Sequence, residues 1–331
     1  MRWYMKLLII AGLGWSGYWF VGAKGQEQLF DNWLETNRAN GWIANSTDMR
    51  VTGFPNRFDT IITALDLRGP SGNWGWQAER FQVFALSYKP NHIILSWPGK
   101  QVITNSEGSL TLEGTKMRGS IELAANSDLT LERLRAEATD LIGISSLGWE
   151  TRARTATLAF FQDSERDNRY RLGFDLGDVT IPQEYMTAVA QAGQSSGVIS
   201  RVLISANIDF ENAINRDTLN TGLPQWNALE IEKVELNWGR ANLSMTGQLS
   251  AGYNGYINGN MNFSVENWQI LWTAYKQITV LSPAELALIE SALSGLSQGN
   301  ILEFSLRFNN GKAYIGPFAI GNAPINPFYL P

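Results

Sequence analysis

The sequence contains no cysteine and only one histidine among its 331 residues. Without thiols the chain cannot form a disulfide, a thiol nucleophile, a Cys-ligated zinc site or an iron–sulfur cluster. The single histidine, His92, cannot build a multi-histidine metal site, and its sequence neighbours offer no partner for general-base catalysis. We therefore predict a protein with no metal, no cofactor and no enzymatic activity.

Charge is scarce as well, because Asp, Glu, Lys and Arg make up 17% of the chain, below the usual share of about a quarter. The net charge is −5, and the basic residues form no stripe that could neutralise phosphates. We therefore expect no nucleic-acid partner. Apolar residues reach 44%, so the chain is long enough for one large domain or two moderate ones with buried cores.

An uncharged run of 17 residues, Leu7–Ala23, follows Arg2 and Lys6. About 17 residues is the lower limit for a helix that spans a bilayer, and basic residues favour the cytoplasmic side. We predict that residues 1–23 form a transmembrane anchor, with residues 7–23 in the membrane and the rest of the chain exported. A cleaved signal peptide is the alternative, because Val21-Gly22-Ala23 suits signal peptidase.

The same run contains Gly12-Leu13-Gly14-Trp15-Ser16-Gly17, which matches G-x-G-x-x-G. A dinucleotide fingerprint needs a strand before it, a helix after it and an acidic residue about 20 positions on. The match lies inside an apolar N-terminal segment instead, so we expect it to bind no nucleotide.

Residues 24–42 predict a linker helix behind the anchor. Leu29, Phe30, Trp33 and Leu34 fall on one helical face, and Gly41 is suited to end the helix. Such a helix either packs on the following sheet or lies on lipid. Its polar face is acidic rather than basic, which favours packing on the sheet.

Beyond residue 43, apolar and polar side chains alternate in many short runs, a pattern typical of antiparallel sheet with one buried face. The stretch YINGNMNFSV at 256–265 places Ile, Gly, Met, Phe and Val on one face and three asparagines on the other. Helices are predicted at 181–195, 267–279 and 283–293. The last follows Ser282-Pro283-Ala284-Glu285, a capping box with proline at the first helical position.

These patterns predict an α+β fold that is mainly β. We expect curved antiparallel sheet with a few packed helices, preceded by one N-terminal transmembrane helix. Residues 43–331 form the β-rich exported domain. An alternative is that this domain is divided into two halves, 43–180 and 181–331.

Four blocks of the sequence carry a resemblance to a known family. They are Gly53-Phe54-Pro55-Asn56-Arg57-Phe58-Asp59, Gln82–Pro98, Asn237-Trp238-Gly239, and Gly311 with Ile315-Gly316-Pro317. Together they resemble the DUF2125 family, a domain of unknown function in alphaproteobacterial proteins, over nearly the whole chain after the anchor. Within the first block we predict a strand-to-turn corner whose Phe54 points inward.

Together with the predicted anchor and the basic Arg2 and Lys6 before it, the resemblance to a bacterial family implies a single-pass protein of the inner membrane with its C-terminal domain in the periplasm. It implies no activity, cofactor or catalytic residue. The exported, sheet-rich organisation is also loosely similar to AsmA-like proteins, whose β-grooves are linked to lipid handling, although this likeness is one of architecture alone.

We therefore predict a non-enzymatic envelope protein that binds lipid or another hydrophobic molecule in a β-sheet groove. The candidate groove is lined by Phe84, Leu86, Tyr88 and Trp97, since the strand at 81–88 is apolar on both faces. The alternative is a scaffold that binds other envelope proteins through sheet edges or the asparagine-rich face. An apolar cavity of roughly several hundred Å³ favours ligand binding, and a solid core favours the scaffold.

Overall fold

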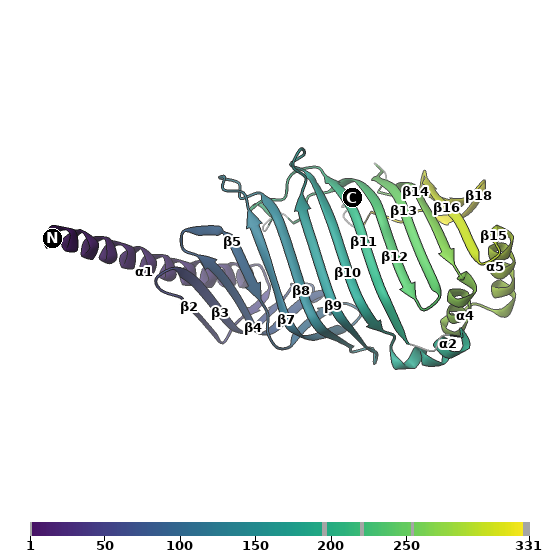
Figure 1. Ribbon diagram of the computed structural model, residues 1–331, viewed down its shortest axis with the longest axis horizontal. Helices are drawn as coiled ribbons and strands as arrows, with labels where there is room; N and C mark the ends of the chain where they lie inside the picture. Colours follow the sequence, from purple (N-terminus) through teal and green to yellow (C-terminus); the bar gives the residue numbers. More distant parts are fainter. Residues whose placement is uncertain (1, 194–196, 219–221, 253–254, 327–331) are drawn as a thin grey trace. The chain divides into compact units, whose positions relative to one another are not determined.

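Long antiparallel strands dominate the computed structural model, which describes residues 2–193, 197–218, 222–252 and 255–326 (Figure 1). The predicted fold class is confirmed: the fold is mainly β, with a few helices and one long apolar helix at the N-terminus. The chain divides into two compact units. Unit 1 comprises Met1–Ala125 and Ala136–Gly148, and unit 2 comprises Asn126–Arg135 and Trp149–Pro331.

The first element of unit 1 is α1, a single helix from Arg2 to Ala39 without a break at Lys24. It therefore contains both the apolar run and the segment predicted as a linker helix. Its N-terminal part extends beyond the strands of unit 1 (Figure 1). Its later part packs on the sheet, where Leu34 is buried with Phe30 beside it, while Leu29 and Trp33 stay exposed.

The sheet of unit 1 is built around two long strands, β3 and β4, which pair with each other. β3 also pairs with β1 and β2, and β4 with β5 and β6, both of which pair with β7. The strands are β1 (Ile43–Asn45), β2 (Asp48–Thr52), β3 (Arg57–Arg68), β4 (Trp74–Leu86), β5 (Lys89–Ser96), β6 (Gln101–Asn105) and β7 (Ser109–Leu123). β8 (Leu131–Ser145) begins in unit 2 and continues into unit 1.

The sheet of unit 2 is a regular antiparallel series in which each strand from β9 to β14 pairs with the next. β14 then pairs with β16, β16 with β15 and β17, and β17 with β18. The strands are β9 (Glu150–Gln162), β10 (Arg169–Thr180), β11 (Val198–Phe210), β12 (Trp226–Trp238), β13 (Ala241–Ala251), β14 (Ile257–Glu266), β15 (Ser297–Gln298), β16 (Ile301–Asn309), β17 (Lys312–Ile315) and β18 (Phe318–Asn322).

The helices of unit 2 lie close to their predicted positions. They are η1 (Gln183–Tyr185), α2 (Met186–Gln191), α4 (Trp268–Ile278) and α5 (Pro283–Leu296). The last residues of the helix predicted at 181–195 lie outside the described part of the chain. At the start of α5 the predicted capping box is present, because Ser282 Oγ accepts from Glu285 N and Ser282 N donates to Glu285 Oε2.

The two faces of the unit 2 sheet differ in polarity. One face carries ion pairs across neighbouring strands, such as Arg169 with Asp209 and Glu230. The other face carries the main core, centred on Tyr170 and Phe210 and extended by residues from the 211–218 loop and the last strands. Two smaller apolar clusters follow along the sheet, where α4 and α5 and then α2 and α4 pack.

Candidate functional site

The four residues predicted to line a groove all belong to unit 1. Phe84 and Leu86 lie on β4, opposite Asp59 and Arg57 on β3. The intervening Ala85 pairs with Phe58, which packs on α1, so Phe84 and Leu86 lie on the face away from that helix. Tyr88 is exposed in the turn after β4, and Trp97 is half-buried after β5. That these four residues line a ligand-binding groove stays a prediction.

Unit 2 contains an apolar pocket of about 480 Å³ that the sequence analysis did not identify. Strands β9 to β12 form its floor near their ends, and η1, α2 and α4 form its walls. Its lining includes Trp149, Val179, Ile199 and Trp238 from the sheet side, and Tyr185, Val189, Leu271, Ala274 and Ile278 from the helices. The lining holds no Asp, Glu, Lys, Arg or His side chain.

The two threonine hydroxyls in the lining are already engaged with the backbone. Thr151 Oγ1 donates to Thr180 O at 2.6 Å, and Thr180 Oγ1 accepts from Arg152 N at 2.8 Å. A molecule in the pocket would therefore meet mainly apolar atoms. Such a site selects for hydrophobic shape rather than for charge.

The mouth of the pocket is also apolar. The lining residues Tyr185 and Ile278 are 38% and 54% exposed. α4 holds this position because Trp268 and Trp272 are buried in the neighbouring cluster with Val265 and Leu302. The helix thus has one face anchored in the core and another that borders the pocket.

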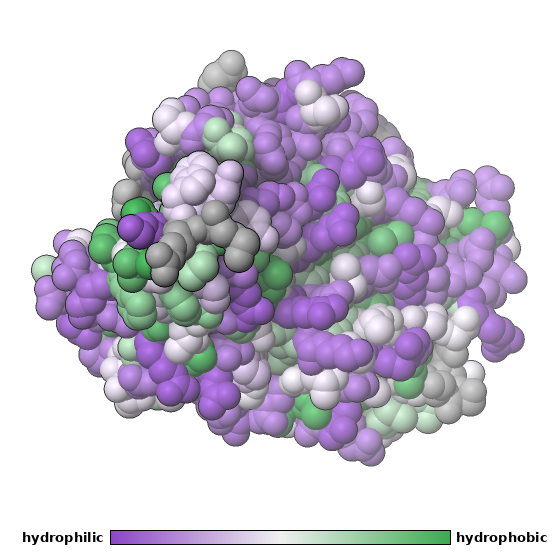
Figure 2. Space-filling model, turned by 60° about the vertical axis from the view of Figure 1, so that its left-hand side comes forward, coloured by the Kyte–Doolittle hydropathy of each residue, from purple (hydrophilic) through white to green (hydrophobic). Residues whose placement is uncertain are grey.

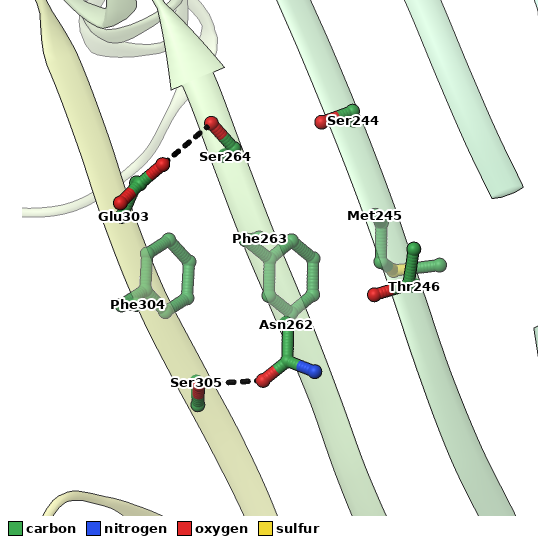
Figure 3. A pocket seen from close by; sticks show the side chains of 9 residues that line it. All are labelled: Ser244, Met245, Thr246, Asn262, Phe263, Ser264, Glu303, Phe304 and Ser305. Carbon is green, nitrogen blue, oxygen red and sulfur yellow. Dashed lines mark hydrogen bonds between the residues drawn. The ribbon is translucent and has the colours of Figure 1, made fainter.

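A second hollow, of about 400 Å³, lies along β13, β14 and β16 (Figure 3). Strand register places its residues in three rows: Ser244, Ser264 and Glu303; Met245, Phe263 and Phe304; and Thr246, Asn262 and Ser305. The Phe263 and Phe304 rings stack at 4.8 Å, and Ser264 Oγ donates to the Glu303 carboxylate at 3.3 Å. The lining contains no histidine or lysine, so it lacks the usual base of a serine hydrolase.

Two segments match sequence motifs of functional sites, but their secondary structure does not suit those functions. Gly12–Gly17 lies inside α1, with no strand before it, so it is not a dinucleotide-binding turn. Gly295-Leu296-Ser297-Gln298-Gly299 matches G-x-S-x-G, but it runs from the end of helix α5 into strand β15, the reverse of a nucleophile elbow. Ser297 Oγ donates to Ser294 O, as expected of a helix end.

Other polar groups form no recognisable reaction centre among the described residues. His92 lies on β5, and its Nε2 is 3.8 Å from Glu122 Oε1 on the paired strand β7. A polar hollow in unit 1 contains Glu79, Glu113 and Asp140, with Lys100 Nζ 3.4 Å from Glu113. Within the described ranges, no group of three or more His, Asp or Glu side chains is arranged to hold a metal ion.

The corner at Gly53–Phe58 receives two hydrogen bonds from α1, and the adjacent turn receives a third. Trp15 Nε1 donates to Pro55 O at 2.8 Å, Trp19 Nε1 donates to Arg57 O at 2.6 Å, and Tyr18 Oη donates to Ser87 O in the adjacent turn at 2.8 Å. Trp19 also stacks on Phe58. Phe54 does not point inward as predicted: it is 49% exposed and stacks on Phe20 of α1.

These features fit a membrane-anchored envelope protein. Among the described residues α1 is the one helix long and apolar enough to cross a membrane, and a mainly β body follows it. The chain belongs to the DUF2125 family, whose model matches residues 19–324. The family is described as an uncharacterized protein conserved in bacteria. No curated protein and no solved structure matches the chain. The family region begins at Trp19, so it includes the part of α1 that contacts Phe58.

Proposed function

We propose that this protein is a non-enzymatic, single-pass protein of the bacterial inner membrane whose periplasmic body binds a lipid or another hydrophobic molecule. In this proposal α1 crosses the membrane, with Arg2 and Lys6 on the cytoplasmic side. The ligand occupies the apolar pocket of unit 2. That pocket, about 480 Å³ in volume and lined without a charged side chain, is the observation that carries the proposal.

The size and the lining both favour a ligand. Pockets that bind small molecules measure roughly 300–1,000 Å³ and are mostly apolar. The lining residue Ile278 is 54% exposed, although burying a large aliphatic side chain is worth about 1.5–3 kcal/mol. An acyl chain seated on it would recover part of that free energy.

Lipid extraction and native mass spectrometry of the full chain, purified from bacterial membranes, test ligand binding. We expect a near-stoichiometric apolar species on the wild-type protein. Ala274→Trp, on the pocket wall, should remove it by filling the cavity. Ala287→Trp, on the exposed surface of α5, is the matched control and should keep it. A ligand-free wild type that also fails to take up fluorescent phospholipid would contradict the proposal.

Anchoring and orientation need a separate experiment. The full chain should stay in the membrane fraction after alkaline carbonate extraction. A C-terminal alkaline phosphatase fusion should be active, because this reporter folds only in the periplasm. Release of the chain by carbonate would contradict anchoring, and an inactive but intact fusion would contradict the orientation.

A scaffold role is the second candidate, and one observation favours it. β18 pairs with β17 and with no other described strand, and all five of its residues are exposed, including Phe318 and Ile320. A free apolar strand edge can accept a strand from another chain. Site-specific crosslinking from position 318 in cells should then capture a defined protein, whereas uniform labelling of lipid would argue against this role.

A further inference from the structure

We propose that the corner at residues 53–58 and the turn at 87–89 are inserted into the acyl region of the membrane that α1 crosses. Unit 1 would then rest directly on the periplasmic leaflet instead of being tethered at a distance. This inference rests on the anchoring part of the proposed function. It is independent of whether the pocket of unit 2 binds a ligand.

The first argument is the length of α1. A helix rises roughly 1.5 Å per residue, and the hydrocarbon layer is about 30 Å thick, so about 20 residues are needed to cross it. The apolar run begins at Leu7, from which the helix rises only about 12 Å to Trp15 and about 18 Å to Trp19. The membrane must therefore extend past the residues that contact the corner, up to the region of Ala23 and Lys24.

The contacts fix the corner at that depth. Trp15, Tyr18 and Trp19 each donate a hydrogen bond to a carbonyl of residues 55, 87 and 57, with donor–acceptor distances between 2.6 and 2.8 Å. The Trp19 ring also stacks on Phe58, which is buried. Because these bonds come from three positions along one turn of helix, the corner cannot slide toward the aqueous side without losing them.

Several large apolar or aromatic side chains are exposed at this level, beside the exposed Asn56 and Arg57 of the corner. Phe54 is 49% exposed, Tyr88 67%, and on the adjoining helix surface Phe20 is 62% and Val21 74% exposed. In Figure 2, which turns the left-hand side of Figure 1 forward, hydrophobic side chains gather around the forward end of α1. Aromatic side chains with one polar end, such as Tyr88, favour the membrane interface.

The backbone of the corner is suited to a site with little water. Irregular backbone is tolerated near lipid only where its polar groups are bonded within the protein. Here Pro55 O, Arg57 O and Ser87 O accept from α1, Asn56 O accepts from Ser87 N at 2.9 Å and from its hydroxyl at 3.0 Å, and Gly53 O accepts from Arg57 N at 3.0 Å.

Two exposed lysines lie close to this apolar surface. Lys89 follows Tyr88 and is exposed, and the Lys24 side chain is 69% exposed at the end of the apolar run. Basic groups that reach an anionic membrane surface favour membrane binding. The apolar side chains of the corner and the turn therefore suit the lipid chains, and the adjacent lysines suit the charged headgroups.

The absence of cysteine makes the test direct, because any introduced cysteine is the sole labelling site. Nitroxide-labelled full-length variants are reconstituted in vesicles of phosphatidylethanolamine and phosphatidylglycerol. Leu13→Cys reports the anchor, Phe54→Cys and Tyr88→Cys report the corner and the turn, and Ser71→Cys, at the opposite end of β3, is the aqueous control. All four native side chains are exposed, so each variant should fold.

The measurement is the ratio of nitroxide relaxation by oxygen, which enriches in lipid, to relaxation by an aqueous nickel chelate. We expect positions 54 and 88 to show a ratio several-fold above position 71, and position 13 the highest ratio. If positions 54 and 88 gave the same ratio as position 71 while position 13 gave a high ratio, this inference would be overturned and anchoring would stand. An aqueous position 13 would overturn anchoring itself.

Discussion

Tyr170 is the largest side chain that the structure buries completely, and its hydroxyl explains how an irregular loop is held over the sheet of unit 2. The ring stacks on Phe160 at 4.9 Å, and the hydroxyl oxygen accepts from Ile214 N at 3.1 Å. Burial raises the pKa of the Tyr170 hydroxyl, because the charged form would lose its hydration. One residue thus joins the core to the 211–218 loop.

Tyr170→Phe should destabilise the protein more than removal of a surface hydroxyl. The substitution leaves the ring in place but deprives Ile214 N of its acceptor, and an unsatisfied buried amide costs about 1–3 kcal/mol. Urea unfolding of the full chain in detergent measures the difference in free energy of unfolding. Tyr88→Phe, at an exposed tyrosine, is the control, and equal stability of the two variants would contradict the prediction.

Glu232 predicts an acid-sensitive contribution to stability on the polar face of unit 2. Hydrogen bonds from Ser205 and Asn207, and the nearby Arg171, lower the pKa of the Glu232 carboxyl. A lowered folded-state pKa stabilises the protein above the unfolded value of about 4.5, and this contribution is lost as the pH falls through the folded-state pKa.

Glu232→Gln should therefore lower stability at pH 7 and flatten the loss of stability below pH about 4.5. The side chain is 35% exposed, so solvent screening limits the effect to less than about 1 kcal/mol. Unfolding free energies measured stepwise from pH 7 downward check this, with Glu132→Gln as an exposed comparison. An unchanged pH profile for Glu232→Gln would show that its hydrogen bonds do not stabilise the fold.

At the scale of elements, features set by local chemistry could be predicted, and features set by a distant partner could not. The capping box at Ser282 depends on residues within one turn, so its sequence pattern was sufficient. The continuity of α1 could not be read from its sequence, because the apolar run ends at Lys24. The helix continues there because Trp19, Ala23 and Leu34 are buried against strands of unit 1.

Two glycines of α1 provide a matched test of this packing. A Cβ at Gly22 would come within 2.8 Å of the Phe58 ring, whereas a Cβ at Gly25 would meet no atom within 4 Å. Gly25→Ala should stabilise the helix by roughly 0.5–1 kcal/mol, since glycine is a poor helix former. Gly22→Ala should leave the melting temperature of the full chain in detergent unchanged or lower it. Equal stabilisation by both substitutions would show that α1 is not packed on Phe58.

At the scale of the whole molecule, the fold class and the family followed from alternation and from motif blocks that the sequence shows directly. The apolar pocket did not, because its lining is assembled from segments between Trp149 and Ile278 that no single periodic run marks. Likewise, alternation at 81–88 identifies apolar positions but not the face that α1 covers. Register is needed to place Phe84 opposite Asp59, away from α1.

The packing of α1 on unit 1 distinguishes the two alternatives for the N-terminal segment, an uncleaved anchor and a cleaved signal peptide. Cleavage after Ala23 would remove Trp19 and Ala23 from a core cluster that they form with Phe58. Truncating a buried Trp to Ala costs about 3–5 kcal/mol, so a chain starting at Lys24 should expose Phe58 and be more easily proteolysed in unit 1. We therefore predict that the mature protein retains α1 as an uncleaved anchor.

Intact-mass analysis and N-terminal sequencing of the protein from bacterial membranes test this prediction. We expect the mature protein to retain residues 19–23. Trp19→Ala in the full chain provides an independent comparison, because it should reproduce the proteolytic sensitivity of a chain that starts at Lys24 while keeping the anchor. A mature N-terminus at Lys24 in a protease-resistant protein would contradict the prediction, since unit 1 would then be stable without the buried face of residues 19–23.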